Sequence, residues 1–340
     1  MATIKDVAKK AGVSVATVSR VLNSYENVRP ETVALVKDAI RELGYHPNFL
    51  GRTLRRQETM KILVMVPTIS NQFYSRLVKG IQTAAQTMGY HTMLAITNSD
   101  PAVEKEQIAI ARRKLVDGVI FLYSTMEAER LSEFAAECPA VLCCELVRGA
   151  RISTISIDDF RAALDGTRFL LENCCRRVAF VSAGELYDSS RLRQLGYRKA
   201  LEETGVPLDE ALLLDEGFTF NAGRRAARRI LEMDKLPDAV FATSDSTAIG
   251  VISALAREGV RTPEDISVMG FDDNQIAEYY LPPLTTISQP QFDIGHKAFE
   301  LLLDKINNQS CLERHILLPH RLVERGSVKK RGDPERKDAF

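Results

Sequence analysis

The sequence predicts two parts: a small all-α unit at the N-terminus, and then a larger α/β unit containing two doubly wound parallel sheets. Residues 3–43 show three helical patterns. From Lys61 onward, short runs of Val, Ile and Leu alternate with helical patterns, which is typical of parallel strands covered by helices on both faces. A chain of 340 residues is also too long for one small core, which favours several domains.

Residues 3–23 are expected to form two short helices with a tight corner between them. Thr3 can cap the first helix, and Asp6 three residues later completes a capping box. Gly12 suits the positive φ at which a helix ends, and Ser14 can cap the second helix. This is the layout of a helix-turn-helix, whose second helix enters the major groove of DNA. An ordinary helical pair in a small core would give the same pattern.

A third helix is expected from Pro30 to Leu43, with Gly44 directly after its end. The three helices define a predicted headpiece over residues 1–47, and residues 48–59 follow as a linker. Charge supports a DNA contact in this part of the chain. The net charge of the whole chain is zero, but residues 1–59 hold ten Lys or Arg against six Asp or Glu.

The linker over residues 48–59 is too short for a stable isolated helix, and Gly51 weakens it further. It carries Arg52, Arg55 and Arg56, with Leu54 among them. By composition alone it fits a charged linker. Beside a helix-turn-helix it also fits a segment that folds on DNA, with the arginines on phosphates and Leu54 wedged between base steps in the minor groove.

The remaining chain, residues 60–328, is expected to form a core of two similar α/β halves. We place the N-lobe at about 60–157 and 291–319, and the C-lobe at about 158–290 and 320–328, with a disordered tail over 329–340. The expected strands are 62–66, 91–96, 118–122, 141–144, 178–181, 212–214, 239–242, 266–270, 315–318 and 321–324. The expected helices are 74–88, 102–115, 127–136, 162–172, 192–204, 222–233, 247–258 and 294–306.

The sequence lacks the signatures of several classes of protein. No apolar run follows Met1 and no 18-residue apolar stretch occurs, so we expect neither a signal peptide nor a membrane span, and a cytoplasmic protein. Six cysteines occur without CxxC spacing, which favours buried free thiols over zinc, and no metal or cofactor is expected. The motifs GxxxxGK(S/T), GxSxG, HExxH and GxGxxG are absent, so an enzyme would need dispersed catalytic residues.

Polar and aromatic side chains follow several predicted core strands, at the ends where ligands of open α/β sheets bind. Carboxylates can accept hydrogen bonds from hydroxyl groups, and an aromatic ring can stack on an apolar face. This mixture suits a polyhydroxylated ring. The strand ends that carry it are 67–74, 123–124, 145, 244–245 and 271–272.

The N-terminal segment closely resembles the headpiece of the lactose-repressor (LacI/GalR-type) family of bacterial transcription regulators. The strings that carry this resemblance are Ile4-Lys5-Asp6-Val7-Ala8, Ala11-Gly12-Val13-Ser14 and Thr17-Val18-Ser19-Arg20-Val21-Leu22-Asn23. In the core, Val116-Asp117-Gly118, Gly270-Phe271-Asp272-Asp273 and residues 282–287 resemble the family too. The resemblance covers residues 3–328 and implies a periplasmic-binding-protein-like core of two lobes, between which the chain crosses three times. A transport receptor would instead lack the headpiece and carry a signal peptide.

This resemblance implies a repressor that binds a double-stranded DNA operator as a homodimer, without a membrane. We expect base contacts from Val15, Ala16 and Arg20, because small residues allow close approach and an arginine can fork onto guanine. Phosphate contacts are expected from Thr3, Ser14, Thr17, Ser19 and Asn23. The linker resembles the family's hinge helix, in which Leu54 matches the wedge, with Asn48, Arg52 and Arg55 beside it. Gly51 departs from the alanine usual in the family.

The resemblance further implies a small effector in the core. Arg193 and Asp272 match effector-binding positions of the family. A solvated arginine at a helix start and a plain aspartate at a strand end would give the same sequence pattern. Phe218, Asn71 and Phe73 match contact positions and fit packing or loop roles equally. Ser124 and Asp245 complete the expected site, and Asp245 could instead cap the next helix. A sugar or sugar derivative is expected, with a nucleoside or base as the alternative.

Overall fold

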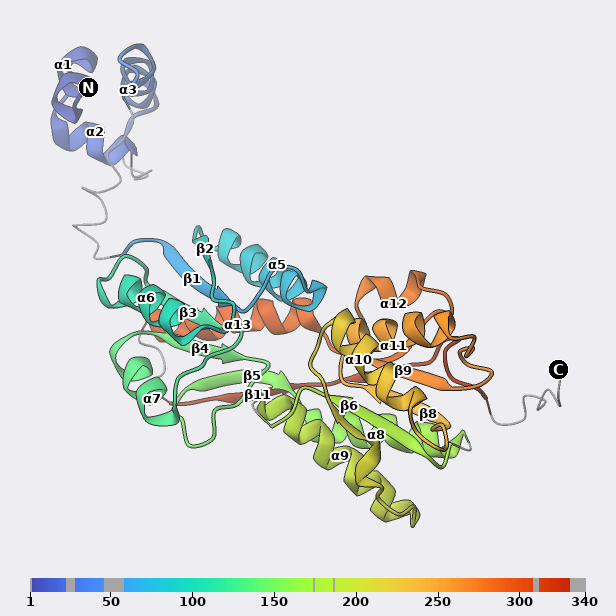
Figure 1. Cartoon of the computed structure of the whole chain (residues 1–340). Coiled ribbons are helices and arrows are strands. Elements are labelled where there is room, and N and C mark those ends of the chain that lie inside the picture. Colours follow the sequence, from blue (N-terminus) through green and yellow to red (C-terminus); the bar gives the residue numbers. More distant parts are fainter. Residues whose placement is uncertain are drawn as a thin grey trace. The chain divides into compact units, whose positions relative to one another are not determined.

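The computed structural model describes residues 2–22, 28–45, 58–173, 175–185, 187–307 and 312–330. The chain divides between Thr59 and Met60 into two units, each of which is described by itself (Figure 1). Over the residues described, no helix combines the length and the apolar character that crossing a membrane requires.

The N-terminal unit is the predicted helix-turn-helix, formed by α1 (Ile4–Ala11), α2 (Val15–Leu22) and α3 (Pro30–Glu42). The Thr3 amide donates to the Asp6 carboxylate at 2.8 Å, so the predicted capping box is present. Gly12 adopts a φ of 68° and ends α1. The small core contains Val7, Ala8, Val18, Val36 and Ala39.

In the second unit, the N-lobe sheet has the strand order β11-β5-β4-β3-β1-β2. All its pairs are parallel. Helices α5 (Gln72–Thr87) and α13 (Gln291–Ile306) cover one face, and α6 (Pro101–Arg112) and α7 (Ala128–Glu137) cover the other (Figure 1). The strands are β1 (Lys61–Val66), β2 (His91–Ile96), β3 (Gly118–Phe121), β4 (Ala140–Cys143), β5 (Ser153–Ile157) and β11 (His315–Leu318).

The C-lobe sheet repeats this order as β12-β10-β9-β8-β6-β7, with the edge pair β10–β12 antiparallel. Helices α8 (Asp159–Glu172) and α9 (Asp188–Thr204) lie on one face, and α10 (Phe220–Leu231) and α11 (Asp245–Arg257) on the other. The strands are β6 (Val178–Ser182), β7 (Leu213–Asp215), β8 (Ala239–Ala242), β9 (Ser267–Asp272), β10 (Thr285–Ser288) and β12 (Arg321–Val323), and α12 (Gln275–Tyr279) follows β9. The predicted fold class is confirmed.

Burial on both faces explains the continuous apolar strands. In β1, Ile62 and Val64 pack in the cluster that contains α5 and α13, whereas Leu63 and Met65 pack on the α6 and α7 side. Successive side chains of a strand point to opposite faces, so both faces require apolar residues. Helices α5 and α13 approach so closely that a Cβ on Gly80 would lie 2.1 Å from the Phe292 carbonyl oxygen.

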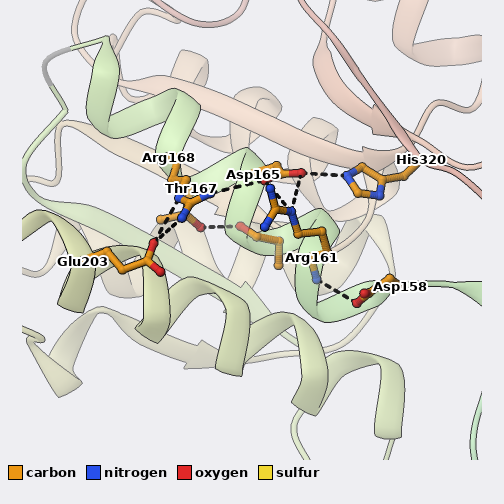
Figure 2. Close-up of polar contacts among 8 residues, drawn as sticks. Asp158, Arg161, Asp165, Thr167, Arg168, Glu203 and His320 are labelled. Atoms are coloured by element: carbon orange, nitrogen blue, oxygen red, sulfur yellow. Dashed lines mark hydrogen bonds and ion pairs between the residues drawn. The ribbon is translucent and has the colours of Figure 1, made fainter.

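Three connections join the two lobes, at 158, 289–290 and 319–320, between β5 and α8, β10 and α13, and β11 and β12. The third connection is held to α8. His320 Nε2 lies 3.2 Å from Asp165 Oδ2, and Arg161 pairs with the same carboxylate at 3.2 Å (Figure 2). Figure 2 also shows Arg168 reaching from Asp165 to Glu203. A side chain of the connection is therefore tied to a helix of the C-lobe.

Two inner strands, β5 and β10, were not predicted, because their sequences STISI and TTIS mix hydroxyl residues with isoleucine. Hydrogen bonds satisfy the buried hydroxyls. Thr154 Oγ1 is 2.9 Å from His315 Nδ1, and Thr286 Oγ1 donates to Asp245 at 2.6 Å. The expected disordered tail began at Lys329, but the Lys329 amide donates to Ser267 Oγ at 3.1 Å. Residues 331–340 lie outside the described part.

Candidate functional site

One candidate site is the outer surface of α2 in the N-terminal unit. Val15, Ala16 and Arg20 are exposed on this helix, whereas Val18 is fully buried against the other two helices. Within the described part of the chain, the Arg20 guanidinium pairs with no carboxylate. The three residues expected to read bases therefore share one accessible surface, on which Arg20 supplies the positive charge.

The hydroxyl residues beside this surface make local capping contacts. The Thr17 amide donates to Ser14 Oγ at 3.1 Å, and the two hydroxyls are 2.9 Å apart, which confirms Ser14 as a cap of α2. The Thr3 hydroxyl donates to Asp6 at 2.7 Å. Ser19 is half-buried. The expected DNA-contacting residues Asn23, Asn48, Arg52, Leu54 and Arg55 lie outside the described residues, as does the remainder of 46–57.

The second candidate site is a cleft of about 890 Å³ between the two lobes of the core. It lies at the carboxyl ends of the strands, where both sheets reverse their strand order beside β1 and β6. Among the predicted residues, the cleft brings together Asn71, Phe73, Arg193, Phe218 and Asp272. Other residues that line it include Tyr74, Glu145, Tyr187, Ser189, Asp215, Glu216, Phe220, Arg225, Thr243 and Ser244.

Arg193 lies on the floor of this cleft and is only 5 % exposed. Its Nε donates to Asp159 Oδ1 at 2.8 Å, and its Nη1 donates to the Thr243 carbonyl at 2.7 Å. The guanidinium also lies 3.7 Å from the centre of the Phe271 ring. The side chain is therefore a fixed, charge-neutralised donor at the base of the cleft. The Thr243 hydroxyl is buried beside it without a partner among the described residues.

Asp272 ends β9 with its backbone in the left-handed region, at a φ of 111°, and Asp273 follows at 57°. Such strain in residues other than glycine persists where the surroundings hold it, commonly at binding sites. Gln289 Nε2 donates to Asp272 Oδ1 at 2.8 Å, and Gln291 donates to the Asp272 carbonyl. Because Gln289 belongs to the second inter-lobe connection, Asp272 touches both the cleft and a hinge. Burial raises the pKa of the Asp272 carboxyl, against the lowering effect of Arg193.

Glu145 approaches from the N-lobe, on the loop after β4, and contacts the start of α9 in the C-lobe. Its carboxylate accepts from the Ser189 hydroxyl at 2.6 Å and the Ser189 amide at 3.1 Å. Burial raises the pKa of Glu145 to about 7, although these hydrogen bonds lower it. Arg148 on the same loop pairs with Asp188 at 3.1 Å. The loop after β4 therefore bridges the lobes beside the cleft.

Two predicted effector residues do not line the cleft. Ser124 is buried and donates to Glu104 at 2.6 Å, which fixes the loop after β3. Asp245 is fully buried and accepts from the Asn274 amide and the Thr286 hydroxyl, each at 2.6 Å. Asp245 does not cap α11 either, because Ser244 does so, with its Oγ accepting from the Thr247 amide at 3.1 Å. Both residues are structural in this arrangement.

Sequence reasoning did not propose several cleft residues, notably Tyr187, Ser189 and Asp215. Asp215 ends β7, so the same strand-end rule could have found it. Tyr187 directly precedes α9, and no sequence pattern marks that position. In the structure its ring packs against Tyr123 of the N-lobe and Phe218 of the C-lobe, with ring centres 5.0 and 5.2 Å apart.

Residues 3–48 match the family described as bacterial regulatory proteins, lacI family, and residues 167–328 match a periplasmic binding protein-like domain. Along the whole chain, the HTH-type transcriptional regulator RegA of Clostridium saccharobutylicum is 36% identical over 333 residues, covering 96% of this chain and all of RegA. RegA therefore matches both units of this chain, in the same order along the sequence.

Solved structures show the same arrangement of elements. A lac repressor dimer bound to operator and the anti-inducer ONPF has a TM-score of 0.86 and 26% identity, covering 96% of this chain and 99% of that chain. A complex of the transcriptional regulator CelR with cellobiose has a TM-score of 0.74 and 31% identity, covering 96% of this chain and all of that chain.

Proposed function

This chain belongs to the LacI family of bacterial regulatory proteins, and we propose that it binds a palindromic operator as a homodimer controlled by a small sugar-like effector. As a member of this family it is a ligand-responsive transcriptional repressor and not an enzyme. The finer parts of the proposal concern the operator, the dimer and the effector, and each is supported by different residues.

The observation that carries the proposal is that one cleft is lined and bridged by both lobes. Glu145 and Arg148 of the N-lobe contact Ser189 and Asp188 of the C-lobe beside it. A ligand that touches both lobes binds one lobe arrangement better than another, so it shifts the population between them. Asp272 couples this event to a connection through Gln289. In our proposal the movement alters the spacing of paired 48–59 segments, and hence operator affinity.

On the DNA side, we propose that α2 enters the major groove in each half-site. Val15 and Ala16 allow close approach, and Arg20 reads a base edge. Thr3, Ser14, Thr17, Ser19 and Asn23 would contact phosphates, which position the helix without reading sequence. In segment 48–59, Leu54 would wedge into the minor groove at the operator centre, with Asn48, Arg52 and Arg55 beside it.

Exposed apolar side chains support the dimer. Tyr279 and Leu281, around the end of α12, are 71% and 82% exposed. Met93, Leu94 and Ile96 on the edge strand β2 are 38%, 49% and 42% exposed. Side chains of this size rarely gather on the surface of a monomer unless they form an interface. We assign both patches to contacts with a second copy of this chain, and the lac repressor structure similar to it is a dimer.

For the effector, carboxylates and hydroxyls beside aromatic rings suit a sugar, whose hydroxyls donate while its apolar face stacks. The CelR relative holds cellobiose in its structure. A nucleoside is the second candidate, because the aromatic residues would also stack on a base. The five aromatic residues that line the cleft are Phe73, Tyr74, Tyr187, Phe218 and Phe220.

The proposal is tested on the full-length protein in two steps. Selection from random duplex DNA should recover a palindromic site, and a thermal-shift panel of sugars, sugar phosphates and nucleosides should yield compounds that raise Tm. We expect such a compound to change operator affinity at least tenfold, in either direction. Selection of asymmetric sites would contradict the dimer on a palindrome. Compounds that bind without affecting operator affinity would contradict the coupling.

A further inference from the structure

Acidic side chains outnumber cationic side chains in the described lining of the cleft. The cationic side chains that line its described wall are Arg193 and Arg225, whereas the carboxylates are Glu145, Asp215, Glu216 and Asp272. A phosphate-binding site needs cations or backbone amides that are available to the phosphate oxygens. Whether either arginine is available therefore decides whether a cationic side chain of this wall can meet a phosphate.

The charge of Arg193 is already neutralised. Its Nε holds Asp159 at 2.8 Å, both side chains are about 6% exposed, and its Nη1 is bonded to the Thr243 carbonyl at 2.7 Å. A buried pair of this kind is costly to break, because separation leaves a buried charge without a partner. Arg193 can still donate a hydrogen bond to a hydroxyl, but its net charge is not free to meet an anion.

Arg225, at the rim of the cleft, is also paired with a carboxylate. Its Nε donates to Glu216 Oε2 at 2.8 Å, and its Nη2 donates to the Glu216 carbonyl at 2.6 Å. The two contacts tie the Arg225 guanidinium, which is carried by α10, to the loop that follows β7. Glu216 also pairs with Arg229 at 3.2 Å, and the Glu216 side chain is only 11% exposed. The arginine therefore serves to position this loop.

Three carboxylates of the cleft form no ion pair with any described cation: Glu145, Asp215 and Asp272. Their partners are uncharged. Glu145 accepts from Ser189 at 2.6 Å, Asp272 from Gln289 at 2.8 Å, and Asp215 from the Ser182 hydroxyl. Asp215 is exposed at the end of β7, so its side chain is open to an entering ligand. Like charges brought together across an interface disfavour binding.

Resting on the proposed function, we infer that this cleft selects uncharged, hydroxyl-rich effectors and rejects their phosphorylated forms, with Asp215 as a specificity-determining residue. The three carboxylates without an ion pair accept hydrogen bonds from ligand hydroxyls. Arg193 and Arg225 already contact carboxylates, so they leave no counter-charge for a phosphate. The protein then binds its effector before a kinase phosphorylates that compound, or after a phosphatase or hydrolase has released the free compound.

The test uses the full-length protein and calorimetric titration with matched pairs. The pairs are ribose and ribose 5-phosphate, glucose and glucose 6-phosphate, cytidine and its 5′-monophosphate, and adenosine and its 5′-monophosphate. We expect at least one uncharged compound to bind, with its phosphorylated partner at least tenfold weaker. Preference for the phosphorylated partner, equal binding of both, or binding of none of the uncharged compounds would overturn the inference.

Two variants test whether Asp215 is responsible for the selectivity against phosphorylated compounds. Asp215→Asn removes the exposed charge but keeps the side-chain size, so the ratio of the two dissociation constants should fall severalfold. Asp234→Asn neutralises an exposed aspartate outside the cleft lining and should leave the ratio unchanged. An unchanged ratio in Asp215→Asn would overturn the role of Asp215. The proposed function is tested by a different measurement, that of operator affinity. It would be contradicted by a compound that binds and leaves operator affinity unaltered.

Discussion

The Glu145 carboxylate of the N-lobe caps the first turn of α9 in the C-lobe by accepting from both the amide and the hydroxyl of Ser189. A carboxylate is favourable at a helix N-terminus, where backbone amides lack partners. The same helix carries Arg193 one turn later, so the inter-lobe contact and the cleft floor belong to one rigid element. The protonation state of Glu145 therefore affects this contact between the lobes directly.

The first prediction concerns the pH dependence of stability. Burial raises the pKa of Glu145 from 4.5 to about 7, so the folded protein holds this proton more tightly than the unfolded chain. The stability that this proton contributes is fully present below about pH 4.5 and is lost as the pH rises through about 7. Burial raises the pKa of Asp272 in the same direction. We expect the urea midpoint to fall between pH 5 and 8.

Glu145→Gln isolates the contribution of this residue, because glutamine resembles the protonated acid and cannot ionise. Its urea midpoint should exceed that of the wild type at pH 8 and approach it at pH 5. Unfolding followed by circular dichroism at each pH supplies both curves. Parallel curves for variant and wild type would show that Glu145 does not titrate in this range.

The second prediction is that Asp272→Asn abolishes the effector response without unfolding the protein. Asparagine tolerates positive φ better than most residues, so the backbone at 111° is retained. The change replaces one accepting oxygen with a donor and removes a charge that burial disfavours. We expect Tm within a few degrees of the wild type and a loss of ligand affinity of at least tenfold by calorimetry. A normal ligand response would show that the cleft assignment is wrong.

The fold was predictable where local chemistry sets it. Thr3 and Gly12 mark the ends of α1 because capping and positive φ depend on residue type. The apolar runs of β1 and β8 follow from burial on both faces. Strands β5 and β10 were missed, since their hydroxyls are satisfied by partners distant in sequence, such as His315 for Thr154.

The cleft was predictable only in part, for the same reason. Asp272 and Arg193, which were expected from their motif positions, line the cleft. Asp245 does not line it, because its partner Thr286 belongs to β10, a strand that the sequence did not reveal. Ser124 does not line it either, because Glu104, on a helix 20 residues earlier, accepts from its hydroxyl. Which strand-end side chains face a ligand depends on such long-range partners.

The third prediction is that Arg20→Ala weakens operator binding by about 1–3 kcal/mol, roughly fivefold to 150-fold, while binding to random DNA changes little. An arginine that reads a base edge contributes to discrimination, whereas one that meets phosphate contributes to every sequence alike. Fluorescence anisotropy on operator and scrambled duplexes at fixed salt measures both. Lys37→Ala is the control, since Lys37 is an exposed cation on α3. Equal losses on both duplexes would contradict base reading by Arg20.

The fourth prediction concerns Leu54, which lies outside the described residues. Leu54→Ala should reduce DNA bending and weaken operator binding, because a shorter side chain cannot unstack a base step. A circular-permutation gel assay on the selected operator reports the bend angle. An unchanged angle would eliminate the wedge, even if affinity falls for another reason.

The last prediction tests the dimer. Leu281 is 82% exposed beside Tyr279, and burying a leucine against a second copy would contribute about 1.5–3 kcal/mol. Leu281→Asp removes that gain and places a charge in the interface, so the dimer dissociation constant should rise by at least tenfold. Sedimentation velocity across a concentration series measures it.

Leu236→Asp supplies the matched control, because Leu236 is 37% exposed on the loop before β8 and lies in neither patch. It introduces the same charge, and its sedimentation should match that of the wild type. Operator binding should weaken with Leu281→Asp alone, since one headpiece cannot occupy two half-sites. A Leu281→Asp protein that remains dimeric at low concentration would place the interface elsewhere, and the β2 patch would then be the next surface to mutate.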